Sequence, residues 1–265
     1  MNEIKLVMCD MDGTLLNDHK EVDSGFINLI DPLNDMGVMV GIASGRQYHS
    51  ITRNFKGIYE KMVFIADNGA IIYVNDEIVD YHTLDRDILE EIIKITETDE
   101  NLSFILCGIK CAYLISDNET VLWNANHYCN GVEKMTSLDD VLSKDEIIKV
   151  TVFDMEYNVK EKINKYIHLR DRINVVKSGF EWIDFNVLGV NKGSAIQKLK
   201  KLYNLSRDNC MAFGDFNNDI EMLKEVKYSV AMANANEDVK AVCNYSCKSN
   251  NENGVSEKLK EVFNL

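Results

Sequence analysis

Short apolar runs alternate along the chain with segments in which apolar residues recur at helical spacing. The runs are rich in Val, Ile and Met and end at turn residues, which is typical of strands buried on both faces of a parallel sheet. The predicted strands are Ile4–Cys9, Val38–Ala43, Met62–Ala66, Cys210–Phe213 and Tyr228–Met232. The predicted helices between them are Ser24–Met36, Arg46–Phe55, Lys192–Tyr203, Asn218–Val226 and Glu237–Cys243. This alternation predicts right-handed crossovers and a doubly wound α/β sheet.

The only proline of the chain, Pro32, falls inside the first predicted helix. Proline inside a helix removes one backbone hydrogen bond and kinks the helix. Alternatively, Asp31 caps a new short turn that has proline at its first position. The sequence leaves both interpretations open.

The middle third of the chain has a different sequence pattern, in which predicted strands and helices follow one another without strict alternation. Its predicted helices are Leu84–Ile95 and Asn158–Leu169. Its predicted strands are Leu102–Cys107, Ala112–Ile115, Ile147–Val152, Ile173–Val176 and Trp182–Phe185. We therefore predict a smaller α+β domain at residues 83–186, inserted into an α/β core formed by residues 1–82 and 187–265.

Composition and charge restrict the class of protein. The chain has 265 residues, of which 46% are hydrophobic and 27% are charged, and its formal net charge is −14. These values are typical of a folded globular protein. We find no basic stripe, no apolar run of about 20 residues and no signal-peptide pattern, so we expect no nucleic-acid partner, no membrane span and a cytoplasmic location. The seven cysteines lack zinc-binding spacing, and we expect reduced thiols.

Reactive side chains follow the predicted strands at their carboxyl ends, which is where open α/β sheets bind ligands. Asp10 and Asp12 follow the first strand, Ser44 follows the second, and Asp215 follows the fourth. Residues i and i+2 of an extended chain project to the same side, so Asp10 and Asp12 address one small volume. Gly13 permits the sharp turn that comes after them.

Asp10, Asp12 and Asp215 together form an oxygen-rich site. Carboxylates this close raise each other's pKa values unless a cation compensates them. Because no His or Cys accompanies them, the site favours Mg²⁺, which binds few protein ligands and leaves positions open for water and phosphate. Ser44, the backbone amides after it and the ammonium group of Lys192 offer hydrogen-bond donors and positive charge to phosphate oxygens.

This set of residues predicts a phosphoryl-transfer reaction. A carboxylate that approaches a phosphate dianion meets a repulsion of about 4 kcal/mol per pair of unit charges near a protein surface, which Mg²⁺ and Lys192 offset. Asp10 then attacks phosphorus and forms an aspartyl-phosphate, which water hydrolyses. Asp12 protonates the leaving alkoxide and later deprotonates the water.

Four segments occur in the order of the motifs of a known superfamily. They are D-M-D-G-T-L, the serine of A-S-G-R, the lysine of V-N-K-G, and G-D-F-N-N-D. In these motifs, and in the large insert between the second and third, the chain resembles the Cof-type, type IIB-capped phosphatases of the haloacid dehalogenase (HAD) superfamily. The resemblance covers essentially the whole chain, since I-A-D-N-G-A, V-A-M-A-N-A and N-E-N-G-V also look like Cof-type segments.

The resemblance implies a Rossmann-like core with an inserted, mobile α/β cap domain, and Mg²⁺-dependent hydrolysis of small phosphate esters. The substrate classes that it implies are sugar phosphates, flavin mononucleotide (FMN) and pyridoxal phosphate. Specificity in such enzymes lies largely in the cap. The aromatic residues of this insert are expected to belong mainly to its core: Tyr113, Trp123, Tyr128, Phe180 and Trp182.

Site residues follow from the resemblance position by position. Asp10 matches the nucleophile and a metal ligand, Asp12 matches the acid/base and binds the metal through its backbone carbonyl, and Asp215 matches the third protein ligand. The residues that match phosphate contacts are the backbone of Met11, Ser44, Gly45, Lys192 and Asn218. The residues expected to support the site are Thr14, Arg46 and Asp219. Asp67 departs from the family, which more often has Ser or Thr before Asn-Gly.

Two alternative functions are compatible with the sequence. A phosphomutase or phosphotransferase would return the phosphoryl group to a second substrate instead of to water. A catalytically idle regulator would bind a phosphorylated metabolite, although such a protein needs no nucleophile. The sequence allows a monomer or a homodimer.

Overall fold

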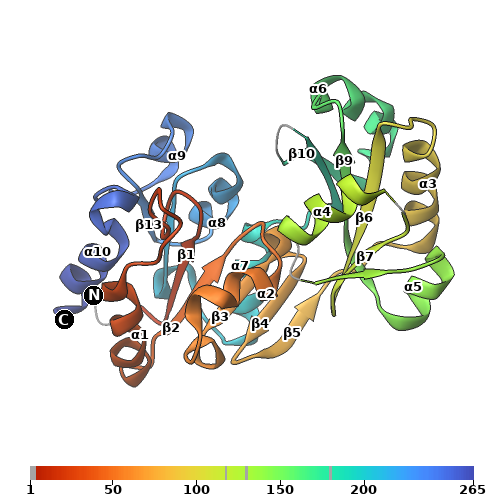
Figure 1. The fold of residues 1–265 in the computed structure, drawn as a ribbon. Helices are drawn as coiled ribbons and strands as arrows, with labels where there is room; N and C mark the ends of the chain where they lie inside the picture. The colour runs from red at the N-terminus through yellow and green to blue at the C-terminus, as the bar shows by residue number, and fades with distance from the viewer. Residues whose placement is uncertain (1–3, 117, 129–130, 179–180) are drawn as a thin grey trace. The chain divides into compact units, whose positions relative to one another are not determined.

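A computed structural model of the chain describes residues 4–116, 118–128, 131–178 and 181–265. The chain forms two compact units, the first made of Met1–Asp80 and Asn191–Leu265 and the second of Tyr81–Val190 (Figure 1). The domain predicted at residues 83–186 lies within the second unit, which extends beyond it at both ends. Each unit is built around a β-sheet of its own.

The first unit contains an eight-stranded sheet with the strand order β14-β13-β12-β1-β2-β3-β4-β5. Its strands are β1 (Leu6–Asp10), β2 (Met39–Ala43), β3 (Val63–Ala66), β4 (Ile71–Val74), β5 (Glu77–Tyr81), β12 (Cys210–Gly214), β13 (Tyr228–Ala231) and β14 (Tyr245–Ser246). Neighbouring strands from β14 to β3 are parallel, and β4 runs antiparallel to β3. The five predicted core strands are all present, whereas β4, β5 and β14 were not predicted.

The strand order reverses at β1, which has β2 on one side and β12 on the other. The register places Asp10 beside Ala43 of β2 and Cys9 beside Phe213 of β12. Every residue of β1 and β12 is buried, as expected for strands that are covered on both faces. Ligands of open α/β sheets bind at such a reversal, outside the carboxyl ends of the strands, and Asp10 is the last residue of β1.

Helices of the first unit follow the predicted segments with small changes. The α-helices are α1 (Ser24–Asp35), α2 (Tyr48–Thr52), α7 (Lys192–Leu202), α8 (Ile220–Lys224), α9 (Glu237–Val242) and α10 (Gly254–Phe263). The 3-10 turns are η1 (Arg53–Phe55), η2 (Tyr59–Lys61), η3 (Asp67–Gly69), η5 (Arg207–Asn209), η6 (Asn217–Asp219) and η7 (Asn250–Glu252). Helix α1 packs against α10, and α8 packs against α7 and α9. Helix α10 was not predicted.

Pro32 lies inside α1, which continues past it to Asp35. The N-cap of this helix is Asp23, whose side chain accepts a hydrogen bond from the backbone N–H of Gly25. The structure therefore excludes a separate short turn capped by Asp31 with Pro32 at its first position. Pro32 cannot donate a backbone hydrogen bond to the preceding turn. Because α1 ends at Asp35, less than one helical turn follows Pro32.

The second unit contains a six-stranded sheet with the strand order β10-β11-β9-β6-β7-β8. Its strands are β6 (Leu102–Gly108), β7 (Ala112–Leu114), β8 (Val132–Lys134), β9 (Ile147–Asp154), β10 (Ile173–Lys177) and β11 (Trp182–Val187). Neighbours are antiparallel except β7 and β8, which are parallel. Its helices are α3 (Arg86–Thr96), α4 (Glu119–Tyr128), α5 (Leu138–Lys144), α6 (Val159–Lys162) and the 3-10 helix η4 (Ile163–Leu169).

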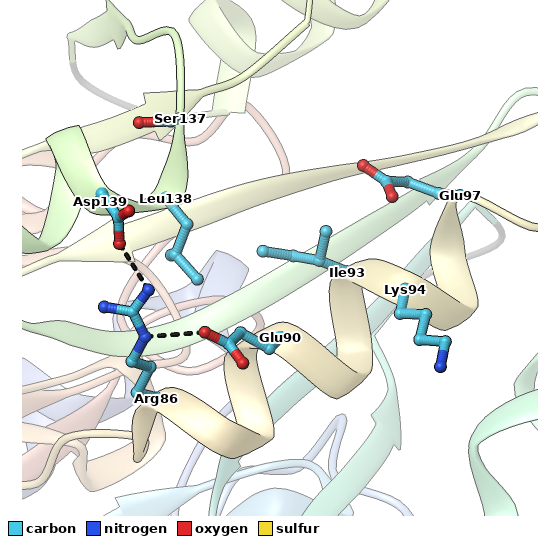
Figure 2. A pocket seen from close by; sticks show the side chains of 8 residues that line it. All are labelled: Arg86, Glu90, Ile93, Lys94, Glu97, Ser137, Leu138 and Asp139. Atoms are coloured by element: carbon cyan, nitrogen blue, oxygen red, sulfur yellow. Dashed lines mark hydrogen bonds and ion pairs between the residues drawn. The ribbon is translucent and has the colours of Figure 1, made fainter.

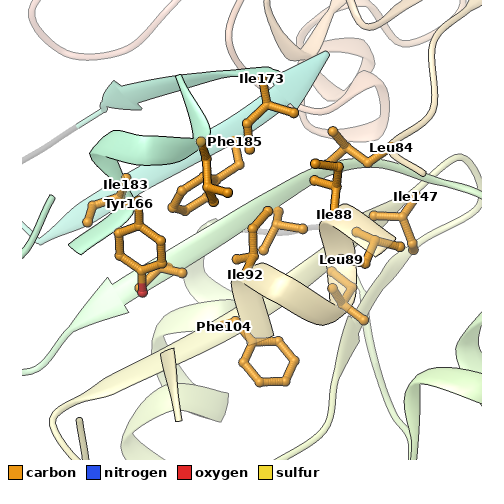
Figure 3. Close-up of a cluster of buried hydrophobic side chains, with 14 of the residues drawn as sticks. Leu84, Ile88, Leu89, Ile92, Phe104, Ile147, Tyr166, Ile173, Ile183 and Phe185 are labelled. Atoms are coloured by element: carbon orange, nitrogen blue, oxygen red, sulfur yellow. The ribbon is translucent and has the colours of Figure 1, made fainter. Parts of the chain in front are cut away.

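One face of this sheet packs on α3, whose apolar side chains point into the largest core of the unit (Figure 3). Ile88, Leu89 and Ile92 of the helix belong to the same buried cluster as Phe104 of β6. Polar atoms inside this core are paired: the hydroxyl groups of Thr96 and Tyr166 lie 2.9 Å apart in a hydrogen bond. The spacing of the α3 residues is the helical one that identified this segment in the sequence.

The opposite face of the same sheet carries a second, smaller core. Ile105 and Cys107 of β6 alternate with residues of the first core and pack in this cluster with Val121 and Ala125 of α4. Of the aromatic residues expected in the core, Tyr113 and Trp182 are buried. The expectation is wrong for Trp123, which is 67% exposed. The Tyr128 side chain and Phe180 lie outside the described residues.

A small pocket of about 250 Å³ lies on the second unit between α3 and the start of α5 (Figure 2). Arg86 at its edge pairs with Glu90 at 2.7 Å and with Asp139 at 2.5 Å. Two carboxylates therefore already neutralise the guanidinium group, and none of the predicted site residues lines the pocket. We assign it no function.

The cysteines of the described residues are all free thiols: Cys9, Cys107, Cys111, Cys210, Cys243 and Cys247. Cys129 lies outside the described residues. Burial raises the pKa of the Cys9 thiol well above its ordinary value and that of Cys210 to about 11. Within the described ranges, no helix combines the length and the apolar character needed to cross a membrane.

The core of the second unit gives a first testable prediction. Ile92→Ala removes a fully buried side chain from the α3 cluster, and we expect the free energy of unfolding to fall by about 2–5 kcal/mol. Urea denaturation followed by circular dichroism measures this change. Lys94→Ala, on the exposed face of the same helix, is the matched control, and we expect a change within about 0.5 kcal/mol. Equal losses in the two variants would contradict the assignment of Ile92 to the core.

Candidate active site

A buried lysine joins two buried carboxylates at the carboxyl end of β1. The Nζ atom of Lys192, which is fully buried, lies 2.5 Å from Oδ1 of Asp10 and 2.6 Å from Oδ1 of Asp219. Lys192 is the first residue of α7, whose start is fixed by a capping box in which Asn191 and Ser194 exchange side-chain and backbone hydrogen bonds. The cap thus determines where the lysine side chain enters the site.

Asp219 holds the loop that follows β12. Its Oδ2 atom accepts hydrogen bonds from the backbone N–H groups of Asp215 and Phe216, at 3.0 and 3.1 Å. A Cβ atom at Gly214 would come within 2.6 Å of the Cβ atom of Asp219, so glycine permits this close approach. Since its other oxygen binds Lys192, Asp219 connects the loop to the buried lysine.

Asp10, Asp215 and Asp219 can each offer a carboxylate oxygen to one metal ion, because such oxygens lie within 4.8 Å of one another. Burial and the nearby charge of Asp219 raise the pKa of Asp10, and burial raises the pKa of Asp215 to about 6. The cluster therefore holds more negative charge than Lys192 alone neutralises. A divalent cation with oxygen ligands fits this donor set.

Gly13 makes the approach of Asp215 possible. Its backbone has a φ of +82°, and a Cβ atom there would lie 2.3 Å from Oδ2 of Asp215. The neighbouring Thr14 donates a hydrogen bond from Oγ1 to Oδ1 of Asp215, at 2.8 Å. The turn after β1 thus places the carboxylate of Asp215 by contact on one side and by a hydrogen bond on the other.

Asp12 points its carboxylate to a pair of cations instead of to the buried cluster. The Arg46 guanidinium binds both of its oxygens, Nε to Oδ2 at 2.7 Å and Nη2 to Oδ1 at 2.6 Å, and Lys20 lies 3.0 Å from Oδ1. Partial burial acts to raise the pKa of Asp12, but the hydrogen bonds and charges of Arg46 and Lys20 lower it overall. Arg46, which we expected to support the site, is thus the ion-pair partner of Asp12.

The residues matched to phosphate contacts lie around the same end of the sheet. Ser44 is buried directly after β2, and its Oγ accepts the backbone N–H of Arg46 at 3.2 Å. The backbone carbonyl of Met11 accepts the N–H groups that close the turn after β1. Asn218 is exposed on the loop after β12, and its Nδ2 donates to Oδ1 of Asn68 at 3.3 Å.

Two asparagines near the carboxyl end of the chain hold the turn after β1. Nδ2 of Asn234 donates to the carbonyl of Gly13 at 2.7 Å, and Nδ2 of Asn250 donates to the carbonyl of Leu16 at 2.9 Å. Asn250 also donates its backbone N–H to Oδ1 of Asn234, at 3.1 Å. Asn234 belongs to the Cof-like segment V-A-M-A-N-A and Asn250 directly precedes N-E-N-G-V, but neither was selected from the sequence as a site residue.

Comparison with known proteins identifies the family of the chain. The model of the haloacid dehalogenase-like hydrolase family matches residues 7–259 of the chain. The chain belongs to this family. It is similar to SMU.1108c of Streptococcus mutans UA159, with 31% identity, a TM-score of 0.85, and coverage of 99% of this chain and 100% of that one.

Two curated relatives that align with nearly the whole chain are named as phosphatases. It is 29% identical over 267 residues to the 5-amino-6-(5-phospho-D-ribitylamino)uracil phosphatase YbjI of Escherichia coli (strain K12), covering 98% of this chain and 96% of the relative. It is 27% identical over 282 residues to the phosphatase YitU of Bacillus subtilis (strain 168), which carries the same activity name, with 98% of each chain covered.

These findings confirm the superfamily, the fold class and the class of enzyme predicted from the sequence. The fold is a Rossmann-like doubly wound core with an inserted α+β cap domain. The enzyme is a HAD-type phosphoric monoester hydrolase.

The contact between Gly13 and Asp215 gives the second prediction. Gly13→Ala places a Cβ atom 2.3 Å from Oδ2 of Asp215, which is too close, so the carboxylate is displaced, and we expect phosphatase kcat/KM to fall by roughly 10- to 100-fold. The matched control is Gly57→Ala, since Gly57 has a φ of +83° and no atom within 4 Å of its Cβ position. Equal losses of activity in the two variants would show that backbone strain, and not displacement of Asp215, is responsible.

Proposed function

We propose that this protein is a Mg²⁺-dependent phosphatase that forms an aspartyl-phosphate on Asp10. The observation that carries the proposal is the buried Asp10 carboxylate at the end of β1, with the Lys192 ammonium 2.5 Å away and the carboxylates of Asp215 and Asp219 within metal-ligand reach. A nucleophile, a fixed cation and a candidate metal site thus meet at the strand reversal.

In the first step, an oxygen of Asp10 attacks phosphorus and the bond from phosphorus to the ester oxygen breaks. The leaving alkoxide takes a proton from Asp12. Lys192 keeps Asp10 in place and offsets part of the repulsion between its carboxylate and the phosphate. In the second step, water attacks the phosphorus of the aspartyl-phosphate, gives a proton to Asp12 and releases phosphate and free Asp10.

The acid/base role requires Asp12 to leave its ion pair. In the structure, Arg46 and Lys20 hold its carboxylate ionised. A proton donor has to lose these contacts, because they favour the charged form. We propose that Asp12 turns away from Arg46 when substrate enters, so that the ion pair belongs to the resting state of the enzyme.

Asp10, Asp215 and the backbone carbonyl of Asp12 would hold the metal ion, with Asp219 supporting the lysine and the loop. When bound, Mg²⁺ supplies positive charge to the phosphate oxygens and to the attacking carboxylate. The remaining phosphate contacts come from the backbone after Asp10, from Ser44 and Gly45, and from Asn218 and Lys192. These assignments use residues of the first unit only.

For the substrate, we propose a phosphorylated sugar alcohol attached to a heterocycle. Two relatives that align with nearly the whole chain are named for 5-amino-6-(5-phospho-D-ribitylamino)uracil, which has this chemistry. It combines features of the sugar phosphates and FMN expected from the sequence. We further propose that the α+β domain, predicted at residues 83–186, selects among such substrates.

The third prediction tests the covalent mechanism. Asp10→Asn removes the nucleophile with little change in shape, and we expect turnover of p-nitrophenyl phosphate with Mg²⁺ to be abolished. EDTA is expected to abolish it in the unsubstituted protein and excess Mg²⁺ to restore it. Asp31→Asn, which changes an exposed carboxylate on α1, is the control for charge and is expected to keep full activity. Undiminished turnover by Asp10→Asn would refute the aspartyl-phosphate.

The fourth prediction concerns the substrate. In a panel of phosphate esters, we expect kcat/KM to be highest for 5-amino-6-(5-phospho-D-ribitylamino)uracil, above hexose phosphates, FMN and pyridoxal phosphate. Phosphate release measures hydrolysis for each compound. A higher value for a simple hexose phosphate would contradict the assignment. Isomerised sugar phosphate without free phosphate would indicate a mutase, and saturable binding without turnover would indicate a regulator.

A further inference from the structure

The segment Asp67–Gly69 (η3) touches the backbone of the second motif. The backbone N–H of Asn68 donates to the carbonyl of Ser44 at 2.9 Å, and that of Asp67 donates to the carbonyl of Arg46 at 3.0 Å. Both hydrogen bonds join the η3 turn, which follows β3, to the loop that follows β2. The turn therefore fixes the backbone on which Ser44 and its neighbours are carried.

The same turn also abuts the third motif. Gly69 has a φ of +104°, and a Cβ atom there would lie 2.4 Å from the carbonyl oxygen of Asn191, the residue that caps α7 before Lys192. Only glycine allows this approach at such a φ. The short η3 turn thus lies against the helix start that carries the buried lysine.

The side chain of Asn68 reaches the fourth motif. Its Oδ1 atom accepts the hydrogen bond from Nδ2 of Asn218, at 3.3 Å. Its Nδ2 atom lies 3.0 Å from the position that a Cβ atom of Gly45 would occupy, so the amide group covers Gly45. One side chain, absent from the residues selected from the sequence, therefore touches two residues matched to phosphate contacts.

We propose that Asn68 is a positioning residue of the phosphate site. Its Oδ1 accepts one of the two N–H bonds of the Asn218 amide, which fixes the amide so that the second N–H is presented to a phosphate oxygen. Its amide over Gly45 keeps the backbone after Ser44 in place. This inference rests on the proposed function, because it deepens the phosphate site assigned there.

Three requirements explain why asparagine occupies this position. The backbone of Asn68 is left-handed, with φ 55° and ψ 31°, a conformation that asparagine tolerates better than most residues. The side chain has to accept a hydrogen bond from Asn218, which glycine cannot do. The side chain also has to be neutral, because an aspartate would place a negative charge beside the bound phosphate dianion.

The fifth prediction tests this inference with inorganic phosphate as the probe, in the presence of Mg²⁺. Asn68→Gly keeps the left-handed backbone and removes the acceptor, and we expect the Kd for phosphate, measured by isothermal titration calorimetry, to rise by roughly 3- to 10-fold. The KM for p-nitrophenyl phosphate is expected to rise by a similar factor, with a smaller change in kcat. Asn68→Asp is expected to weaken phosphate binding further.

A matched control separates these effects from backbone strain. Asn75 is exposed in the turn between β4 and β5 and has a φ of 53°, and Asn75→Gly is expected to leave the Kd for phosphate unchanged. A double-mutant cycle then isolates the contact. If Asn68 acts through Asn218, Asn68→Gly adds little to the loss already caused by Asn218→Ala.

Several outcomes would overturn the inference. Unchanged phosphate affinity in Asn68→Gly, with a loss in Asn218→Ala, would show that Asn68 does not position Asn218. Fully additive losses in the double variant would do the same. If Asn68→Gly fails to fold, unchanged affinity in Asn68→Asp decides against the proposal. If the unsubstituted protein hydrolyses phosphate esters but the variants give the contrary results, only the inference about Asn68 is refuted. If the unsubstituted protein neither binds phosphate nor hydrolyses phosphate esters, the proposed function itself is refuted.

Discussion

One buried ammonium group is shared by two buried carboxylates, and the rest of the catalytic architecture is arranged around it. Lys192 binds Asp10 at the end of β1 and Asp219 in the loop after β12. Burial of an ion pair has a desolvation cost, and removing one partner of such a pair destabilises a protein strongly. The lysine therefore links Asp10, the loop after β12 and helix α7, and loss of one of these charged partners is expected to destabilise the others.

This arrangement explains why the surplus of negative charge is tolerable. Three carboxylates surround one lysine, and the pKa of Asp10 and of Asp215 is raised by burial. The carboxylate of Asp12 has a different environment, because it forms ion pairs with Arg46 and Lys20. Two residues apart in the sequence, Asp10 and Asp12 thus have opposite environments, which is a physical basis for giving them different chemical tasks.

Much of the core and the residues that gather at the end of β1 could be predicted because they depend on local patterns. Apolar runs identified the parallel strands, and the strand ends identified Asp10, Asp12 and Asp215. Helix α10 was not predicted because its start lacks the usual signal. The backbone of its N-cap residue, Asn253, is in the left-handed conformation, and the Asn253 side chain makes no capping hydrogen bond. The pairing of Asn68 with Asn218 joins residues 150 positions apart, and no periodicity in a single sequence reports which turns meet.

Cys9 and Cys210 lie in the adjacent strands β1 and β12, buried and with raised pKa values. A thiol in this state reacts with an alkylating reagent only after the sheet around it opens and the group ionises. Cys9 is also the residue directly before Asp10. The chain therefore contains native chemical probes beside Asp10, the proposed nucleophile, and their labelling rates measure how often strands β1 and β12 separate.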